Sequence, residues 1–570
     1  MKLCIALMGL VVSTTATADI YQYEDCDGNG TLLLTELDAV PGVNLSGLYL
    51  GCADLTAPNT FLVAANMSGA DLTSADLSGV VMNYANLPGA TLTDAYLIST
   101  NLHGAILEGA NLSNSVPRGA NLFGANLVAA DLSGADLTGA DLNYAYLSDA
   151  NLNGANLSGA DLSSAFQWQF ATWTLATYNS DTQFPPKMDP DALGMRHVEQ
   201  TIVVGGGGYS NIQDAIDSIG DDWTGPTEIL LMPGVYTDIH QQVVNTNGKE
   251  LWIHSDQGAD VTFIDGENTR RGIVCISEED NVIIEDITIR NCYAQHGAGI
   301  WLSTSSPQII RCVLDNNEAY GFGGGMYIQN TASPTLELCK FTNNTAVDGG
   351  GVKNYGNSPT FTNCTFFNNS AETGGGAHNY GSHATYDGCV FLENNASDFG
   401  GGIHNEFGSS PDFINCTIDG NTSETGGGFR NDASSNPTLT NCSIVNNVAT
   451  NGGGVQNHNS SPSFNNCSIE NNTGIGMLSL LKSNPSLENS SVCDNLPVNI
   501  EGPYADLGGN TICVVECESD VNSDGTVNVH DLLQVIAAWG NPGGDEDLND
   551  DGTVNVHDIL VLVGAWGACP

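Results

Sequence analysis

Two twelve-residue segments near the C-terminus have the residue types and the spacing needed to bind a metal ion. They read DVNSDGTVNVHD at 520–531 and DLNDDGTVNVHD at 547–558. Oxygen-bearing side chains stand at positions 1, 3, 5, 9 and 12, Gly at position 6 allows the turn, and Thr at position 7 offers its backbone carbonyl. Calcium binds in loops of this design. The predicted calcium ligands are Asp520, Asn522, Asp524, Thr526, Asn528 and Asp531 in the first loop, and Asp547, Asn549, Asp551, Thr553, Asn555 and Asp558 in the second.

An apolar helix is expected after each loop, over DLLQVIAAWG and DILVLVGAWG, and the two units repeat at an offset of 27 residues. The pair resembles a type I dockerin. That resemblance implies calcium as a cofactor and a cohesin-like partner. Such modules are common on secreted polysaccharide-degrading enzymes. The family reads its partner with positions 10 and 11, which are Val529-His530 and Val556-His557 here. The duplication indicates a symmetric, two-way surface, and an intramolecular calcium clasp is the alternative.

A third candidate loop lies near the N-terminus, in DCDGNGTLLLTE at 25–36. It matches the EF-hand pattern through Asp25, Asp27, Asn29 and Glu36, with Gly30 at the turn. We therefore expect calcium binding here as well. Because the loop stands alone, a chance match is the alternative.

A second kind of candidate binding site recurs in the middle of the chain. The segments GGGVKN, GGGAHN, GGGIHN and GGGFRN, which begin at residues 349, 374, 400 and 426, each place a cation or an imidazole at the fifth position. In a stack of coils, strand alternation would turn these side chains outward, one coil apart. The predicted ligand-binding column consists of Trp301, Tyr327, Lys353, His378, His404 and Arg430, and Gln456 continues it.

Stacked cations with aromatic residues at one end could receive an acidic or neutral polysaccharide lying along the coils. Four acidic residues precede the Gly triplets and could pair with the column: Asp348, Glu372, Asp398 and Glu424. The alternative is a solvated face with scattered charges that keep the protein soluble.

The coils that would carry this column are predicted from units of 25–27 residues in the second half of the chain. Each unit has three short alternating runs separated by Asn or Gly, which tolerate the backbone of sharp corners. Stacked Asn side chains can bond to one another along the coils. One Cys per unit is predicted to stack inward as a small apolar residue, with a ladder of disulfides as the alternative, at Cys312, Cys339, Cys364, Cys389, Cys416, Cys442 and Cys467.

These units resemble pectin-lyase-like right-handed parallel β-helices, in which a short helix caps the first coil; YSNIQDAIDSI would be that helix. They also resemble the repeats of polymorphic outer-membrane proteins, which implies an adhesive surface. Enzymes of the pectin-lyase-like fold use clustered Asp or calcium-assisted Arg. Asp265, Asp286 and Arg290 could be such a cluster, although surface ion pairs are the simpler interpretation.

The first half of the chain has a period of five residues. Leu recurs at nearly every fifth position from Leu62 to Leu162, and Ala usually lies two residues before it. A period of five fits neither an α-helix nor a flat strand, whereas four five-residue sides make a square coil that stacks by backbone hydrogen bonding. These residues resemble the pentapeptide-repeat family, which implies a right-handed quadrilateral β-helix. Leu55 and Leu62 are out of phase, so we expect a two-residue insertion near Pro58.

Composition and the N-terminus limit the location and the partners. The chain has 13 Lys and Arg against 65 Asp and Glu, so it lacks the clustered cations that nucleic-acid binding requires. Residues 1–18 have a short apolar run after Lys2 and small residues before Asp19, as in a secretory signal. No later stretch has the apolar length of a transmembrane segment. We therefore expect a secreted or cell-surface protein whose cysteines can form disulfides, with the candidate pairs Cys26–Cys52, Cys493–Cys513 and Cys517–Cys569.

The predicted fold is mainly β, with two β-solenoids in series and a small helical module. The predicted parts are a signal peptide (1–18), an EF-hand-like segment (19–43), a pentapeptide-repeat β-helix (44–166), a cap and linker (167–197), a right-handed three-sided parallel β-helix (198–510) and a dockerin-like calcium-binding module (511–570). Two functions remain open. One is a non-catalytic adhesion or binding protein, favoured by the regularity of the repeats. The other is a polysaccharide lyase or glycoside hydrolase, favoured by the dockerin resemblance.

Overall fold

The computed structural model describes residues 19–22, 33–38, 42–50, 53–55, 62–220, 223, 225–276, 281–513, 519, 521–522, 526–542, 544–549 and 551–568. Several predictions fall outside these residues: the signal peptide, the Cys26–Cys52 and Cys517–Cys569 pairs, and the candidate ligands Asp25, Asp27, Asn29, Asp520 and Asp524. The chain forms two units, residues 1–200 and 201–570. Among the helices that the structure describes, none is long and apolar enough to cross a membrane.

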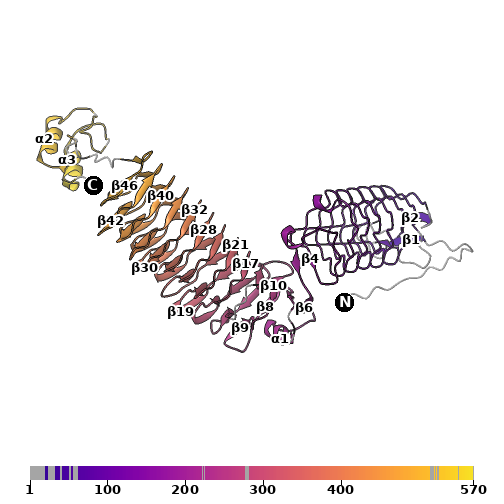
Figure 1. The fold of residues 1–570 in the computed structure, drawn as a ribbon. Coiled ribbons are helices and arrows are strands. Elements are labelled where there is room, and N and C mark those ends of the chain that lie inside the picture. The colour runs from indigo at the N-terminus through magenta and orange to yellow at the C-terminus, as the bar shows by residue number, and fades with distance from the viewer. Residues whose placement is uncertain are drawn as a thin grey trace, which may run out of the picture. The chain divides into compact units, whose positions relative to one another are not determined.

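The first unit is a stack of square coils, as the five-residue period predicts (Figure 1). Asn66 pairs in parallel with Asn86, and Asp131 with Asn151, so one coil takes 20 residues. Backbone hydrogen bonds join neighbouring coils, for example from Leu72 N to Thr91 O at 2.7 Å. The repeated Leu and Ala side chains point inward and form one continuous buried core. Burial of these two columns holds the stack together because each coil covers the apolar edge of the next.

The predicted two-residue insertion is visible in the coil register, and the pairing of coils continues past the last repeat. Asn44 pairs with Asn66, 22 residues on, so the first described coil is two residues longer than the following ones. After the last repeat, Trp173 is buried against the end of the core, and Thr172 still pairs with Asn151. The short elements of the first unit are β1 (Asp19–Gln22), β2 (Leu33–Asp38), β3 (Ala53–Asp54), η1 (Trp168–Phe170), β4 (Thr177–Tyr178), η2 (Asp191–Leu193) and β5 (Arg196–His197), with β1 to β3 forming a small antiparallel sheet.

The second unit contains a three-sided parallel solenoid, in which each side of the coil adds a strand to one of three long sheets (Figure 1). The first sheet consists of β6 (Gln200–Val204), β7 (Thr227–Leu231), β10 (Leu251–Ser255), β13 (Ile283–Glu285), β17 (Gln308–Ile310), β21 (Thr335–Glu337), β24 (Thr360–Thr362), β28 (Thr385–Asp387), β32 (Asp412–Ile414), β36 (Thr438–Thr440), β40 (Ser463–Asn465), β43 (Ser486–Glu488) and β46 (Ala505–Asp506). The second sheet consists of β8 (Gly234–Tyr236), β11 (Thr262–Asp265), β14 (Thr288–Arg290), β18 (Val313–Asp315), β22 (Lys340–Thr342), β25 (Thr365–Phe367), β29 (Val390–Leu392), β33 (Thr417–Asp419), β37 (Ser443–Val445), β41 (Ser468–Glu470), β44 (Ser491–Cys493) and β47 (Thr511–Ile512). The third sheet consists of β9 (Gln242–Asn245), β12 (Arg271–Cys275), β16 (Ile300–Ser303), β20 (Met326–Gln329), β23 (Val352–Tyr355), β27 (Ala377–Tyr380), β31 (Ile403–Glu406), β35 (Phe429–Asp432), β39 (Val455–His458), β42 (Met477–Leu480) and β45 (Ile500–Glu501).

The interior of this solenoid is built from stacked identical side chains. The seven repeat cysteines are all buried and free, which confirms the inward column and excludes a disulfide ladder among them. Buried Asn residues form the predicted ladder at one corner. For example, Asn394 Nδ2 donates to Asn421 Oδ1 at 2.9 Å, and Asn369 Nδ2 donates to Asn394 Oδ1 at 2.9 Å. These bonds satisfy the buried amides and lock the register of successive coils.

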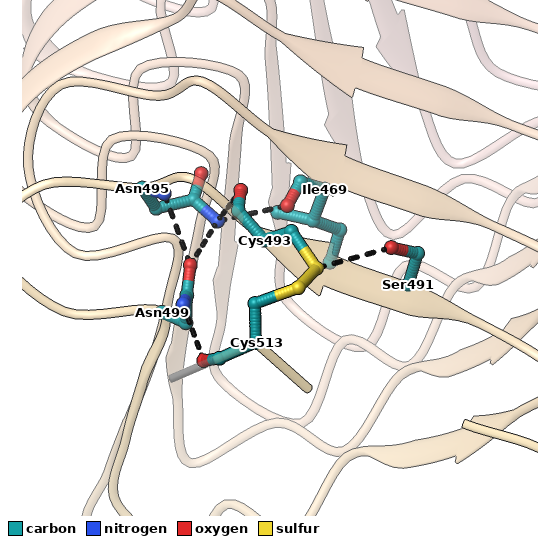
Figure 2. Close-up of a disulfide and its surroundings, with 6 residues drawn as sticks. All are labelled: Ile469, Ser491, Cys493, Asn495, Asn499 and Cys513. Carbon is teal, nitrogen blue, oxygen red and sulfur yellow. Dashed lines mark hydrogen bonds between the residues drawn. A yellow bond between two sulfur atoms is a disulfide. The ribbon is translucent and has the colours of Figure 1, made fainter. Parts of the chain in front are cut away.

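The two ends of the solenoid are closed differently. At the start, helix α1 (Ile212–Asp217) packs Ile212 and Ile216 onto the core, as YSNIQDAIDSI predicts. At the end, a disulfide joins Cys493 to Cys513, as predicted, and Figure 2 shows its surroundings. Beside it, Asn499 Nδ2 donates to Cys513 O at 2.7 Å. The covalent bond therefore ties the last segment back onto the preceding coil.

Short outer strands extend the third side of most coils. They are β15 (Tyr293–His296), β19 (Glu318–Phe322), β26 (Ser370–Thr373), β30 (Asn395–Phe399), β34 (Thr422–Thr425) and β38 (Val448–Asn451). A Gly triplet lies between β26 and β27. Gly374 has φ +64°, and a Cβ on Gly375 would lie 2.4 Å from Gly401 O. Only Gly permits this tight turn, which brings Thr373 against the first residues of β27.

The C-terminal module contains α2 (Val529–Ala537), α3 (Val556–Gly564) and the antiparallel pair β48 (Thr526–Val527) and β49 (Gly567–Ala568). Each helix begins with a capping box, in which Asn528 pairs with Asp531 and Asn555 with Asp558. The expected helices after the loops are therefore present. The last residue of each loop, at position 12, lies in the first turn of the following helix.

Candidate functional site

The third sheet aligns the predicted column residue by residue. Parallel pairing places Trp301 beside Tyr327, then Lys353, His378, His404, Arg430 and Gln456, each one coil from the next. The alignment is thus as predicted, but the expected exposure is wrong. Lys353 is 3% exposed, and Tyr327, His378, His404, Arg430 and Gln456 are buried as well, while Trp301 is half-buried.

Two flanking rows of side chains cover this column. One row comes from the turns before the Gly triplets, where pairing aligns Phe322, Asp348, Thr373, Phe399 and Thr425. The other row lies two residues further along each strand of the third sheet. It includes Tyr355, Tyr380, Glu406, Asp432 and His458. The column therefore faces away from the core and is still enclosed, because the outer strands add a layer beside it.

Lys353 and His378 form one half of a buried polar network. Lys353 Nζ lies 2.9 Å from His378 Nδ1 and 3.3 Å from Asp348 Oδ2. Thr373 Oγ1 lies 2.9 Å from the same His378 nitrogen and donates to Asp348 Oδ1 at 3.0 Å. Burial lowers the pKa of Lys353 to about 8 against the opposing effect of Asp348. Burial, with Lys353 and His404 adding to it, holds the pKa of His378 well below its usual range, so this imidazole is neutral.

His404 and Arg430 form the other half of the network around Asp432. Arg430 donates from Nε and Nη2 to the two carboxylate oxygens at 2.6 and 2.7 Å, and His404 Nε2 lies 3.2 Å from Asp432 Oδ2. Burial alone would raise the pKa of Asp432, but the bonds from His404 and Arg430 lower it to about 2. His404 Nδ1 is buried and has no hydrogen-bond partner.

The acidic residues before the Gly triplets only partly behave as expected. Asp348 pairs with Lys353. Glu372, Asp398 and Glu424 lie one residue before the aligned flanking row and are exposed. Strand alternation turns them away from the column, so the expectation that they pair with it is wrong.

The residues considered for catalysis, Asp265, Asp286 and Arg290, make ion pairs, as the sequence indicates. Arg290 Nε donates to Asp265 Oδ2 at 2.9 Å. Asp286 is held by Arg311, which also contacts Glu285 at 2.6 Å. These residues therefore form one ion pair, Arg290 with Asp265, and a separate cluster of Arg311 with Asp286 and Glu285.

All six predicted ligands of the second C-terminal loop lie among the described residues, and hydrogen bonds within the loop fix several of them. Gly552 N donates to Asp547 Oδ2 at 2.9 Å, and Asn549 N donates to Asp558 Oδ1 at 3.2 Å. Asp551 accepts from Thr553 N at 3.1 Å. Asp547 Oδ1 is buried without a hydrogen-bond partner. An uncompensated buried carboxylate oxygen in a ring of oxygen donors fits a bound cation.

The described part of the first loop repeats this arrangement. Asn522 N donates to Asp531 Oδ1 at 3.1 Å, and Asn528 N donates to Asp531 Oδ2 at 2.8 Å, with Asp531 fully buried. Thr526 begins β48. In the N-terminal candidate loop, Glu36 lies in strand β2, where an EF-hand would begin its second helix.

Family models match three separate parts of the chain. Pentapeptide repeats match within residues 52–166, in eight copies, and the right-handed beta helix region matches 236–366 and 349–492. The dockerin type I domain matches residues 518–565. The chain joins pentapeptide repeats, a right-handed β-helix and a type I dockerin domain. No curated protein sequence matches it.

Solved structures resemble parts of this chain. A pentapeptide repeat protein from the Arabidopsis thaliana thylakoid lumen is 33% identical over 19% of this chain and 70% of its own, with a TM-score of 0.17. A pentapeptide repeat protein from Nostoc is 36% identical over 19% of this chain and 84% of its own, with a TM-score of 0.15. A protein of Geobacillus virus E2, designated ORF18, is 14% identical over 53% of this chain and 57% of its own, with a TM-score of 0.32.

The dockerin domain exposes a repeated apolar face that motif matching alone does not find. Val535 and Leu562 pack inside the domain. Four pairs of apolar side chains at the 27-residue offset remain 48–63% exposed: Val529 and Val556, Leu533 and Leu560, Ile536 and Val563, and Trp539 and Trp566. His530 and His557 are also exposed, and each ring contacts the Asn that caps its helix. Helical periodicity in the two apolar stretches was the available signal.

Proposed function

We propose that this chain is a non-catalytic protein of the cell exterior whose dockerin domain attaches it to a cohesin-like partner. The observation that supports this is the duplicated apolar face of α2 and α3. Leu533 and Leu560 are among its most exposed members. Exposed apolar side chains gathered in one domain favour protein binding, and two equivalent copies favour attachment in either of two orientations.

Calcium would hold this face in shape. Asp547, Asn549, Asp551, Thr553, Asn555 and Asp558 would hold one ion, and the corresponding residues from Asp520 to Asp531 a second. Because Asp531 and Asp558 also cap α2 and α3, loss of the ions would loosen the first turn of both helices. Partner binding should therefore require calcium.

Binding of the full chain to a panel of purified cohesin domains, in calcium and after chelation, tests this proposal. With two equivalent half-faces, Leu533→Ser or Leu560→Ser should each leave binding largely intact, while the double variant should lose it. Asp545→Asn, in the exposed connection between the helices, serves as the control. No binding to any cohesin, or unchanged binding by the double variant, would overturn the docking proposal and favour an intramolecular clasp.

The β-helix would contribute an adhesive or polysaccharide-binding surface. Beside the buried column, Tyr355, Tyr380 and Phe407 stack on successive coils with ring centroids 5.1 and 4.9 Å apart. Phe407 is 64% exposed, so much of its ring is accessible to solvent. An accessible aromatic ring is suited to stacking on a sugar ring.

A polysaccharide screen with the full chain separates this role from catalysis. Retention of a polysaccharide by the wild type, with weaker retention by Phe407→Ser, would support binding by this surface. The control is Phe123→Ser in the pentapeptide repeats, where the ring stacks between His103 and Tyr144. Release of oligosaccharides would instead make the β-helix the catalytic domain of a lyase or glycoside hydrolase.

A further inference from the structure

Three side chains of types that can ligate a metal ion meet in the middle of the third sheet. His378 on β27 and His404 on β31 occupy the same position in adjacent coils, with ring centroids 4.6 Å apart. Glu406 lies two residues after His404, on the same face of β31. One potential ligand atom from each of the three residues lies within 4.8 Å of the other two, and His378 Nε2 is 3.4 Å from Glu406 Oε2.

The hydrogen-bonding pattern leaves a ligand atom without a partner in this cluster. His404 uses Nε2 to contact Asp432, which leaves Nδ1 as its free nitrogen. That nitrogen is buried and unpartnered, and the His404 side chain is almost completely enclosed. A buried polar atom without a partner is rare in a folded protein and needs an explanation. A bound metal ion would supply the missing partner.

We propose that His378, His404 and Glu406 bind a divalent transition-metal ion, for which zinc is the best match. The ligand atoms would be His378 Nε2, His404 Nδ1 and a carboxylate oxygen of Glu406. Two imidazoles and one carboxylate favour zinc over calcium or magnesium, which prefer all-oxygen sites. Zinc bonds of about 2.0–2.1 Å at tetrahedral angles place ligand atoms roughly 3.3 Å apart, which is close to the 3.4 Å between His378 Nε2 and Glu406 Oε2, and the third ligand atom would move inward from its place within 4.8 Å. Glu406 is partly exposed, which gives the ion a route of entry and leaves a fourth position for water.

Further side chains orient both imidazoles for this role. Asp432 accepts the Nε2 proton of His404 and is itself fixed by two bonds from Arg430. With zinc on His378 Nε2, the ring proton would lie on Nδ1 and point to Thr373 Oγ1, which is 2.9 Å away and is in turn bonded to Asp348. Lys353 would then lose its bond to that nitrogen. Metal-binding histidines in proteins commonly have such supporting partners, and losing one lowers metal affinity by about 10–100-fold.

Lys353 opposes the ion and therefore offers a distinctive test. Its ammonium group lies within 3.2 Å of both nitrogens of His378. A positive charge so close must weaken the binding of a cation. Lys353→Met removes that charge and keeps most of the side-chain volume, so it should bind zinc more tightly than the wild type. A network that serves only folding predicts no zinc binding by either protein.

The experiment uses the full chain with its calcium loops saturated by excess calcium. Equilibrium dialysis against Zn²⁺ gives the stoichiometry and affinity, and Co²⁺ substitution gives a visible absorption spectrum that reports nitrogen and oxygen ligation. The wild type should bind one more ion than Glu406→Gln or His404→Phe does. Asp432→Asn should bind about tenfold more weakly. His383→Gln, an exposed histidine of the same β-helix, is the matched control and should behave as the wild type.

Glu406→Gln changes a partly exposed side chain without changing its volume, so it provides an answer even if His404→Phe fails to fold. Far-ultraviolet circular dichroism of each variant checks folding. Absence of Zn²⁺ binding by both the wild type and Lys353→Met would overturn the proposal. Equal stoichiometry in the wild type and Glu406→Gln would also overturn it and would place any bound zinc elsewhere.

Discussion

Lys353 Nζ lies 2.9 Å from His378 Nδ1, one coil away, and both side chains are buried. This contact shows that a column of cations and imidazoles in the sequence is an enclosed, mutually bonded network in the folded protein. Its members hold adjacent coils together through side chains as well as through the backbone. Substitutions in the column should therefore change the stability of the β-helix.

Removing the lysine without filling its space should destabilise the surrounding coils. Lys353→Ser should lower the free energy of unfolding by about 3 kcal/mol, because Asp348 loses its cation and a cavity forms. Lys353→Met should cost less, since its side chain fills the same space. Hydrogen exchange of the β23 and β27 amides, with chelator present, measures both effects. Equal protection in the two variants would show that the contact contributes little.

The buried Asn ladder should be more important to stability than the exposed one. Asn394→Ala removes an amide bonded to Asn369, Asn421 and the backbone of Phe366. Because buried partners are left unsatisfied, the expected loss is about 2–4 kcal/mol. Asn441→Gly is the control: it removes exposed ladder bonds and suits the φ of +56° at that position. Denaturant unfolding compares the two, and a smaller loss for Asn394→Ala would contradict the prediction.

The second C-terminal loop should bind one calcium ion. Asp547→Asn replaces one oxygen of the carboxylate whose Oδ1 is buried without a partner, so the number of bound calcium ions should fall by one. Calcium titration with a fluorescent competitor measures the stoichiometry, and Trp566 fluorescence reports the fold nearby. Asp545→Asn lies outside both loops and should change neither. Unchanged stoichiometry in Asp547→Asn would mean that this loop does not bind calcium.

The Cys493–Cys513 disulfide should protect the last coil from fraying. The disulfide closes a loop of 20 residues. Removing it increases the conformational entropy of the unfolded chain, which should lower the free energy of unfolding by about 3 kcal/mol. Cys513→Ser should therefore make the segment after residue 493 more sensitive to proteolysis, while the central coils remain resistant. Cys416→Ser, at a free buried thiol, is the comparison and should not expose this segment. Equal cleavage patterns would argue against a stabilising role.

His296 should make the stability of the first coils depend on pH. Burial, and to a smaller extent Arg271, lower the pKa of His296 below its ordinary value of 6.5. Its Nδ1 accepts a bond from Phe322 N at 3.2 Å, which also requires the neutral ring. Below pH 6.5 the unfolded chain therefore binds more protons than the folded one. The contribution of His296 is present above its unfolded pKa and is lost as pH falls toward the folded value, by at most about 1.4 kcal/mol per pH unit.

His296→Asn keeps a hydrogen-bond acceptor and removes the titration. As the pH falls from about 7.5 to about 5, the free energy of unfolding of the wild type should therefore decrease relative to that of the variant. Every other titratable group is common to both proteins, so its effect cancels when the two free energies of unfolding are subtracted. A difference that stays constant over this range would show that His296 is equally easy to protonate in both states.

Much of the architecture could be predicted because the relevant patterns are periodic. The spacing of Leu72 and its equivalents predicted a 20-residue coil, and Cys364 and its equivalents predicted one inward position per coil. The cover over the column could not be predicted in the same way, since Thr373 and Phe399 differ in type while occupying equivalent positions beside it. Glu406 and Asp432 were missed, although alternation places each on the same face as the column residue two positions earlier.

The sequence by itself determined the coil lengths, the inward columns, the Asn ladder and the oxygen spacing of the C-terminal loops. These properties follow from local geometry repeated many times, so each repeat reports the same constraint. Only the tertiary structure decided which polar side chains are enclosed and which lie open. Enclosure depends on how tightly the Gly turns bring the outer strands against the third sheet. For that reason His378 and His404 lie inside a network with Glu406 at its edge. On α2 and α3, Leu533 and Leu560 remain exposed because no other described element covers them.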